Sequence, residues 1–146
     1  MAARVKINLK NMPKIKKVVR DSIEEAVETV SDDLIRTSSE AAPHDNGILE
    51  QSFGKSVAWK GNKCIAVVDY SVKEDNGQNG FDYAYWIHED EDYNLGEKSV
   101  EKAAGGGGVG MSGRTYAVGH HFLTRPLNGE AEAYKDYMQS VVDSNL

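Results

Sequence analysis

The longest regular pattern of apolar and polar positions in the chain lies in residues 13–41. Apolar side chains recur there in steps of three and four, which places them on one face of a helix: Ile15, Val18, Val19, Ile23, Ala26, Val27, Val30, Leu34 and Ile35. Pro13 is compatible with a first helical turn, whereas Pro43 disfavours helical geometry in the residue before it. The pattern therefore predicts one long amphipathic helix that ends near Ala42.

A β-hairpin is predicted after this helix. Two runs rich in apolar residues, 56–60 and 63–69, flank the dipeptide Gly61-Asn62, which is typical of a two-residue turn between antiparallel strands. Residues 48–53 are expected to form a short helical turn that leads into the first of these strands.

The remaining pattern predicts one more strand and one more helix. The short aromatic stretch 83–88 is typical of either a helical turn or the start of a strand. Residues 89–113 show no regular period and contain four consecutive glycines, so we expect a long flexible loop. Residues 115–118 favour a last strand. Thr124 is expected to cap a final helix with Pro126 in its first turn.

These elements predict an α+β fold, in which an antiparallel sheet of about four strands packs against the long N-terminal helix and a C-terminal helix. The final helix has an apolar stripe of its own, made of Leu127, Ala131, Tyr134, Met138 and Val141 or Val142. A length of 146 residues without internal repeats indicates a single domain over residues 1–146. We expect no membrane partner, because no apolar run approaches the length of a spanning helix and the N-terminus lacks the apolar core of a signal peptide.

Charge is distributed unevenly along the chain. Residues 4–20 carry seven basic and no acidic side chains, residues 21–33 carry six acidic and no basic ones, and residues 69–92 are again acidic. Opposite charges on one small chain suit head-to-tail contact between copies, with Lys14, Lys16 and Lys17 as candidate interface residues. The alternative is a solvated helix surface. A nucleic-acid role is less favoured, because no aromatic residues interleave with the basic ones and the net charge is −6.

An aromatic cluster adds a second candidate interface. Tyr83, Tyr85 and Trp86 lie close together in the sequence, and Tyr and Trp are enriched in the centres of protein interfaces. The alternative is that Tyr83 and Trp86 fill the core of a small domain. Both interpretations hold together if alternate residues face opposite ways.

The sequence gives little support for catalysis or for a metal site. The glycine run 105–108 lacks the Lys-Ser or Lys-Thr pair of a phosphate-binding loop, and no G-x-S-x-G elbow is present. His120 and His121 are adjacent, so on an extended segment they point to opposite faces, and no H-x-x-x-H spacing accompanies them. We therefore expect no enzymatic activity, no cofactor and no metal.

Three segments carry a family resemblance. Residues 42–53 read APHDNGILEQSF, residues 82–89 read DYAYWIHE, and residues 116–127 read YAVGHHFLTRPL. In this order and spacing they resemble the small neck or tail-completion proteins of long-tailed bacteriophages, which typically read A-P-x-x-T-G-x-L-x-x-S, then Y-A-x-Y-V-E-x-G, then P-F-L-x-P-A. The chain departs from that pattern at Asn46, at the acidic run 89–92 and at His121.

The resemblance implies packing roles for nine residues in these segments: Pro43, Gly47, Leu49, Phe53, Tyr83, Ala84, Phe122, Leu123 and Pro126. Pro43 and Gly47 would shape the exit from the first helix, and Leu49 and Phe53 would lie under the sheet. Tyr83 and Ala84 would begin the central aromatic segment. The remaining three would seat the final helix.

The resemblance also implies a function. It indicates a structural virion protein without an active site, a minor capsid component that forms a ring at the head–tail connection and joins or seals capsid and tail. The ring would be a hexamer by family analogy, assembled in the host cytoplasm and located in the neck or upper tail of the virion. Its partners would be further copies of the chain and other neck, connector and tail-tube proteins, and nucleic acid would at most pass through the ring.

Three alternatives remain open from the sequence. Within the same class, the chain could be a tail terminator that caps the tail tube. From a different class, it could be a small metal- or nucleotide-dependent enzyme that uses His120, His121 and the glycine-rich loop. It could also be a monomeric binding module.

Overall fold

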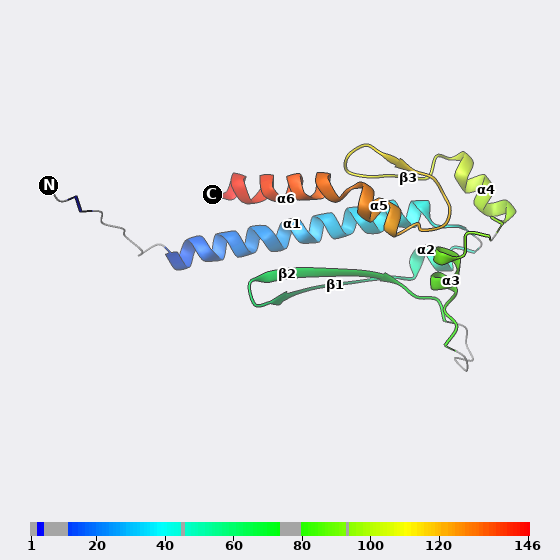
Figure 1. The fold of residues 1–146 in the computed structure, drawn as a ribbon, viewed down its shortest axis with the longest axis horizontal. Coiled ribbons are helices and arrows are strands. Elements are labelled where there is room, and N and C mark those ends of the chain that lie inside the picture. Colours follow the sequence, from blue (N-terminus) through cyan, green and yellow to red (C-terminus); the bar gives the residue numbers. More distant parts are fainter. Residues whose placement is uncertain (1–2, 5–11, 45, 74–79, 93) are drawn as a thin grey trace.

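The computed structural model describes residues 3–4, 12–44, 46–73, 80–92 and 94–146. They form a mixture of helices and antiparallel sheet, as the sequence predicts (Figure 1). The elements in chain order are α1 (Met12–Ala41), α2 (Ile48–Gln51), β1 (Phe53–Lys60), β2 (Lys63–Tyr70), α3 (Tyr83–Glu89), α4 (Glu97–Ala104), β3 (Gly108–Val109), β4 (Thr115–Tyr116), α5 (Thr124–Gly129) and α6 (Ala131–Asn145).

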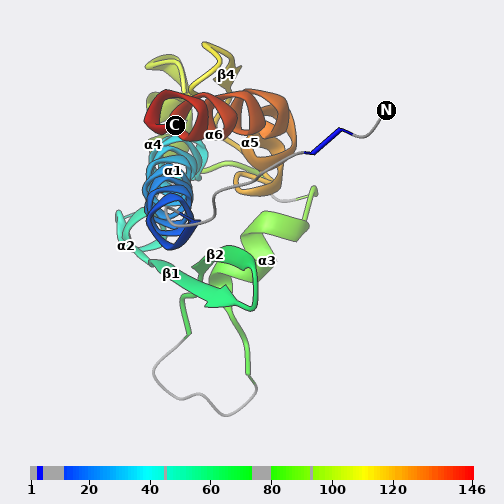
Figure 2. The ribbon, with the colours of Figure 1, turned by 90° about the vertical axis from the view of Figure 1, so that its left-hand side faces the viewer.

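Helix α1 runs through the middle of the molecule. The hairpin β1–β2 lies along one side of it, and α5, α6 and the strands β3 and β4 lie on the other (Figures 1 and 2). Ala26 and Leu34 on the predicted apolar stripe of α1 are buried, whereas Ile15 and Val18 near its start are exposed. The predicted helix is therefore confirmed, but its first turns leave their apolar side chains uncovered within the described structure.

The β-hairpin is confirmed. Lys60 pairs with Lys63 across the predicted turn, and Gly61 adopts φ 62°, in the left-handed region that glycine reaches without strain. Exposure alternates along β2, so that every second residue from Cys64 to Tyr70 is partly buried. The intervening side chains, which include the large apolar Ile65 and Val67, are exposed.

The prediction of one sheet of about four strands is wrong for the described residues. The four strands form two separate two-stranded sheets, β1–β2 and β3–β4. Helix α1 separates them (Figure 2). Strand β3 lies so close to α1 that a Cβ on Gly108 would stand 2.2 Å from the carbonyl oxygen of Thr37. A glycine at this position lets a strand pack on the helix instead of joining the hairpin.

The expectation of an irregular stretch over residues 89–113 is also wrong in part, because α4 and β3 lie within it. Helix α4 packs on the end of α1. The Ser99 hydroxyl accepts from the His44 amide at 2.8 Å and donates to the His44 carbonyl at 2.9 Å. The Lys102 ammonium donates to the carbonyls of Ser39 and Ala42 at 2.8 and 2.7 Å. The Ser39 carbonyl belongs to the last turn of α1 and Ala42 directly follows that helix, so α4 supplies a cap for its end. Flexibility of the stretch stays a prediction.

The final helix consists of two pieces. Helices α5 and α6 meet at Glu130, whose backbone has φ −95° and ψ −1°. Thr124 is the first residue of α5 rather than its cap, and Leu123 holds the cap position without a side-chain hydrogen bond. Strand β4 covers residues 115–116 of the predicted 115–118. The ambiguous aromatic stretch is helical, because the Asp82 carboxylate caps α3 by accepting from the Ala84 amide at 3.0 Å.

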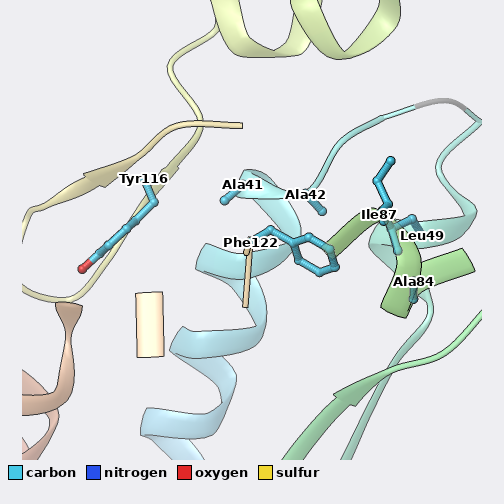
Figure 3. Close-up of a cluster of buried hydrophobic side chains, with 7 residues drawn as sticks. All are labelled: Ala41, Ala42, Leu49, Ala84, Ile87, Tyr116 and Phe122. Carbon is cyan, nitrogen blue, oxygen red and sulfur yellow. The ribbon is translucent and has the colours of Figure 1, made fainter. Parts of the chain in front are cut away.

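The hydrophobic core lies near the C-terminal end of α1. Figure 3 shows the cluster, made of Ala41, Ala42, Leu49, Ala84, Ile87, Tyr116 and Phe122. The Phe122 ring is the largest fully buried side chain and meets the rings of Tyr70 and His88 edge-on, each at a centroid distance of 5.1 Å. Aromatic edge-to-face contact of this kind adds to the stabilisation from burial.

Candidate assembly interface

The three motif segments of the sequence meet at one end of the molecule, which we call the motif end. Leu49, Ala84 and Phe122 come one from each segment and share the same buried cluster (Figure 3). Tyr83 and Leu123 are partly buried against that cluster. These residues therefore have packing positions of the kind that the family resemblance implies.

The other motif residues are buried, exposed or, for one glycine, in a left-handed backbone conformation. Pro43 and Pro126 are buried, and Gly47 adopts φ 85° just before α2, a conformation that favours glycine. Phe53 is the exception, because its side chain is 44% exposed. Its ring meets that of Tyr70 edge-on, at a centroid distance of 6.4 Å. The expectation that Phe53 lies under the sheet is wrong, since its position at the outer start of β1 leaves it on the surface.

The first turns of α1, residues 13–20, form a surface that we call the basic end. Lys14, Lys16 and Lys17 are exposed there, and Ile15 between them is 47% exposed. The helix extends past the end of α6 and past the tip of the hairpin (Figure 1). Lys17 donates to Asp21 at 2.6 Å, and this hydrogen bond raises the pKa of the ammonium. Lys6 and Lys10 of the same basic run lie outside the described residues.

The acidic middle of α1 is largely engaged within the chain. The Lys55 ammonium on β1 donates to Asp32 at 2.7 Å and to Glu28 at 2.6 Å, and these bonds raise its pKa. The Trp59 indole donates to Glu24 at 3.3 Å, and the Arg20 guanidinium stands 3.9 Å from the centre of the Trp59 ring. Residues 21–33 therefore hold the hairpin against α1, which the sequence pattern did not predict.

An acidic and aromatic pocket lies at the motif end. It has a volume of about 380 Å³ and is lined by Gly80, Phe81, Asp82, Tyr85, Trp86, Glu89 and Asp90. Tyr85 is 70% exposed, whereas Tyr83 packs against the core. The Trp86 ring stands 6.0 Å from that of Tyr83 and 6.4 Å from that of Phe81, and so bridges core and surface. Tyr83 therefore contributes to the core, as one sequence interpretation expects, whereas Tyr85 is exposed and its role in an interface stays a prediction.

Asp82 gives this pocket a fixed negative charge. Burial of the carboxylate opposes ionisation, but hydrogen bonds from the Ser71 hydroxyl at 2.7 Å, from the Val72 amide at 2.8 Å and from the Ala84 amide outweigh it. The pKa of Asp82 is therefore lowered from its usual value. The carboxylate stays ionised while it caps α3.

A second, apolar groove runs between α1, β2 and the α5–α6 pair. Its volume is about 320 Å³, and its lining consists of Val30, Ser31, Leu34, Ala66, Val67, Val68, Leu123, Leu127 and Tyr134. Val67 and Leu127 are both exposed at its edge. No sequence pattern predicts this groove, because its lining residues come from distant parts of the chain.

The residues weighed for enzyme chemistry have other partners in the structure. His120 Nδ1 lies 2.9 Å from the Ile87 carbonyl, and His121 Nε2 lies 2.9 Å from a Glu91 oxygen. In the glycine run, a Cβ on Gly107 would stand 2.2 Å from the Tyr116 carbonyl, and one on Gly108 would meet Thr37 at the same distance. Close backbone packing therefore explains these two glycines.

Comparisons of the chain with protein-family models, with curated proteins and with solved structures found no match. The family resemblance therefore rests on the three motif segments themselves. Across the described ranges of the chain, no helix combines the length and the apolar character needed to cross a bilayer.

Proposed function

We propose that the chain is a structural virion protein of a tailed bacteriophage, which forms a homo-oligomeric ring at the head–tail connection and joins or seals capsid and tail. The ring is a hexamer by family analogy. The ordered motif triplet supports the class of protein. The observation that carries the assembly mode is that the basic end of α1 and helix α3 lie at opposite ends of the long axis (Figure 1), and α3 carries residues that line the acidic, aromatic pocket.

Surfaces of opposite charge at opposite ends suit a head-to-tail contact. In such a contact each subunit presents two different faces, and a closed ring results when the rotation between subunits closes. The ammonium groups of the basic end would meet the carboxylates of Asp82 and Asp90, while the exposed rings of the pocket accept cations on their faces. Individual exposed ion pairs contribute little and are screened by salt.

Apolar surface would supply most of the affinity. At the basic end Ile15 and Val18 are exposed beside the lysines, and at the pocket Phe81 and Tyr85 are exposed beside the carboxylates. Each CH₂ group removed from water contributes about 0.8 kcal/mol to binding. An exposed charge pair usually contributes less than that. Charge would therefore set the register of the subunits, and apolar contact would hold them.

The hairpin offers further surface for assembly. Ile65 and Val67 on β2 are exposed, and in the described part of the chain each strand of the hairpin has one edge without a strand neighbour. A two-stranded hairpin is marginally stable alone, and free edges pair readily with another chain. A four-stranded sheet would then form across two subunits, when the hairpin of a neighbour pairs with such an edge.

The test reverses the charge of the basic end in the triple variant Lys14→Glu, Lys16→Glu, Lys17→Glu. Native mass spectrometry and light scattering should show a ring for the natural chain and a folded monomer for the variant. A matched control reverses three exposed basic residues outside the basic end and the hairpin, Lys98, Arg114 and Lys135, and should still assemble. Adding Asp90→Lys to the first variant should restore part of the assembly.

Three outcomes would contradict this proposal. A natural chain that stays monomeric at high concentration would favour a monomeric binding module. A triple variant that assembles normally at low and high salt would show that the basic end is a solvated surface. A triple variant that unfolds would show that these lysines belong to the fold. Genes for portal or capsid proteins on one side, and for a tail-tube protein on the other, would support the virion location.

A further inference from the structure

Two histidines and a glutamate converge where α3 meets the segment before α5. His88, Glu89 and His121 each offer one ligand atom, and these atoms all lie within 4.8 Å of one another. His88 Nδ1 is 2.9 Å from a Glu89 oxygen. A second carboxylate, that of Glu91, lies 2.9 Å from His121 Nε2 at the border of the cluster. The set combines imidazole nitrogens with carboxylate oxygens in one small volume.

The fold holds both histidines in place. The His121 amide donates to the His88 carbonyl at 2.9 Å, and the His121 carbonyl accepts from the Arg125 amide at 2.9 Å. The His88 ring is packed edge-on against Phe122 and against His121, at centroid distances of 5.1 and 5.2 Å. His121 is the one non-glycine residue with positive φ, 53°, in the described part of the chain. Ligands fixed in this way lose little freedom when an ion binds.

We propose that His88, Glu89 and His121 bind a divalent transition-metal ion, with Zn²⁺ as the best fit. Zinc is bound by histidine nitrogen and carboxylate oxygen at about 2.0–2.2 Å, and two histidines with one glutamate form a known type of zinc ligand set. A tetrahedral ion would hold its ligand atoms roughly 3.4 Å apart. Small side-chain rotations close the remaining separation, because Glu89 is exposed and its side chain is long.

The surroundings of the cluster favour this chemistry. His88 Nε2 faces Thr124, whose amide donates to it at 3.4 Å and whose hydroxyl stands 3.5 Å away. Metal binding at His88 Nδ1 would therefore move the ring proton to Nε2, where the Thr124 hydroxyl can accept it. The run 89–92 is acidic throughout, so its potential attracts a cation. Hard ions such as Mg²⁺ prefer oxygen ligands and fit the two imidazoles poorly.

The expectation of no metal considered a different pair, His120 and His121. Only His121 belongs to the cluster, because His120 lies against the Ile87 carbonyl. The second histidine and the glutamate come from the end of α3 and reach His121 through the packing around Phe122. The ion would join the second motif segment to the third. This inference goes beyond the proposed function, since it holds for the single chain whether or not a ring forms.

The test titrates Zn²⁺ into the full chain after treatment with EDTA and dialysis, by calorimetry and by thermal unfolding. The variants are His121→Asn, because Asn tolerates positive φ, and Glu89→Gln, whose exposed site leaves folding unchanged. The control is His44→Asn, which removes a histidine paired with the Glu50 carboxylate at 2.7 Å, outside the cluster. Circular dichroism checks that every variant is folded.

We expect one Zn²⁺ per natural chain and per control chain, a higher melting temperature with Zn²⁺, and no such rise with Mg²⁺. Each cluster variant should bind Zn²⁺ roughly tenfold more weakly or worse. Absence of Zn²⁺ binding by the natural chain at millimolar concentration would overturn the proposal. Equal Zn²⁺ affinity in the cluster variants and the natural chain would overturn it as well.

Discussion

The two ends of α1 use the same kinds of side chain for opposite purposes. At the motif end, charged groups are enclosed and bond to backbone, as Glu130 and Lys102 do. At the basic end and along the hairpin, charged groups bond to other exposed charges, as Lys17 and Lys55 do. A buried polar group that loses its partner lowers the stability of the fold far more than an exposed one, because water can hydrogen-bond to the exposed group. The motif end is therefore built to hold the fold, and the basic end remains available for contact.

Removal of the Glu130 carboxylate should have the largest effect on stability. The side chain is fully buried and accepts from the Ser112 amide at 2.7 Å, from the Ser112 hydroxyl and from the Tyr116 hydroxyl at 2.9 Å. Glu130→Ala leaves these donors unpaired, so we expect the free energy of unfolding to fall by about 3 kcal/mol in urea titrations. Glu132→Ala, an exposed neighbour on α6, should change it by less than about 0.5 kcal/mol. Equal losses of stability in Glu130→Ala and Glu132→Ala would show that the buried carboxylate is no more important than the exposed one.

Two lysines of similar exposure compare the two regions directly. The side chains of Lys102 and Lys55 are 22% and 26% exposed, and each ammonium has two or three partners. Lys102→Met removes the donor to the carbonyls of Ser39 and Ala42 and leaves the Glu50 carboxylate with His44 as its remaining partner, so stability should fall by about 2 kcal/mol. Lys55→Met should cost much less, because the freed carboxylates of Glu28 and Asp32 are open to water. The midpoints of urea unfolding measure the stability of both variants. A larger loss of stability in Lys55→Met than in Lys102→Met would contradict this prediction.

The smallest effect should come from Asp82, at the border between the motif end and the solvent. Its pKa is lowered in the folded chain, so its contribution is fully present above the ordinary carboxyl pKa of about 4 and is lost as the pH falls through the folded value. Asp82→Asn keeps the capping geometry but cannot titrate, and should cost about 1 kcal/mol at pH 7. Urea titrations at pH 7, 5 and 3 should show a stability gap that is constant down to pH 5 and smaller at pH 3. A gap independent of pH would show that the charge of Asp82 has no part in the cap.

Elements with strong local signals could be predicted from the sequence. The long apolar period of α1 and the Gly61-Asn62 turn each determine their structure over a few residues, and both were confirmed. Helix α4 was missed because its buried contacts are polar. Ser99 and Lys102 face the backbone of α1 and give no apolar period. A pattern of hydrophobicity cannot detect a helix whose main role is to satisfy carbonyl groups.

The arrangement of the strands and the candidate sites depended on packing between distant segments. Nothing local to Gly108 shows that β3 will lie on Thr37 rather than beside the hairpin. The pairing of the acidic face of α1 with Lys55 and Trp59 needs the hairpin to fold back, which the charge pattern alone does not specify. His88 and His121 likewise meet through the core. The lysines and aromatic residues chosen from the sequence are exposed or half-buried as an interface needs, and their role stays a proposal.

The contacts of Asp33 bear on how the chain folds during synthesis. This carboxylate of α1 accepts from the Tyr134 hydroxyl at 2.8 Å and from the Met111 amide at 3.1 Å. Tyr134 lies 101 residues and Met111 lies 78 residues after Asp33 in the chain. Contacts of such high sequence separation form late, because a long loop must close first. Helix α1 therefore leaves the ribosome long before α6 can cover it. Its apolar stripe stays open to chaperones and proteases until almost the whole chain has been made.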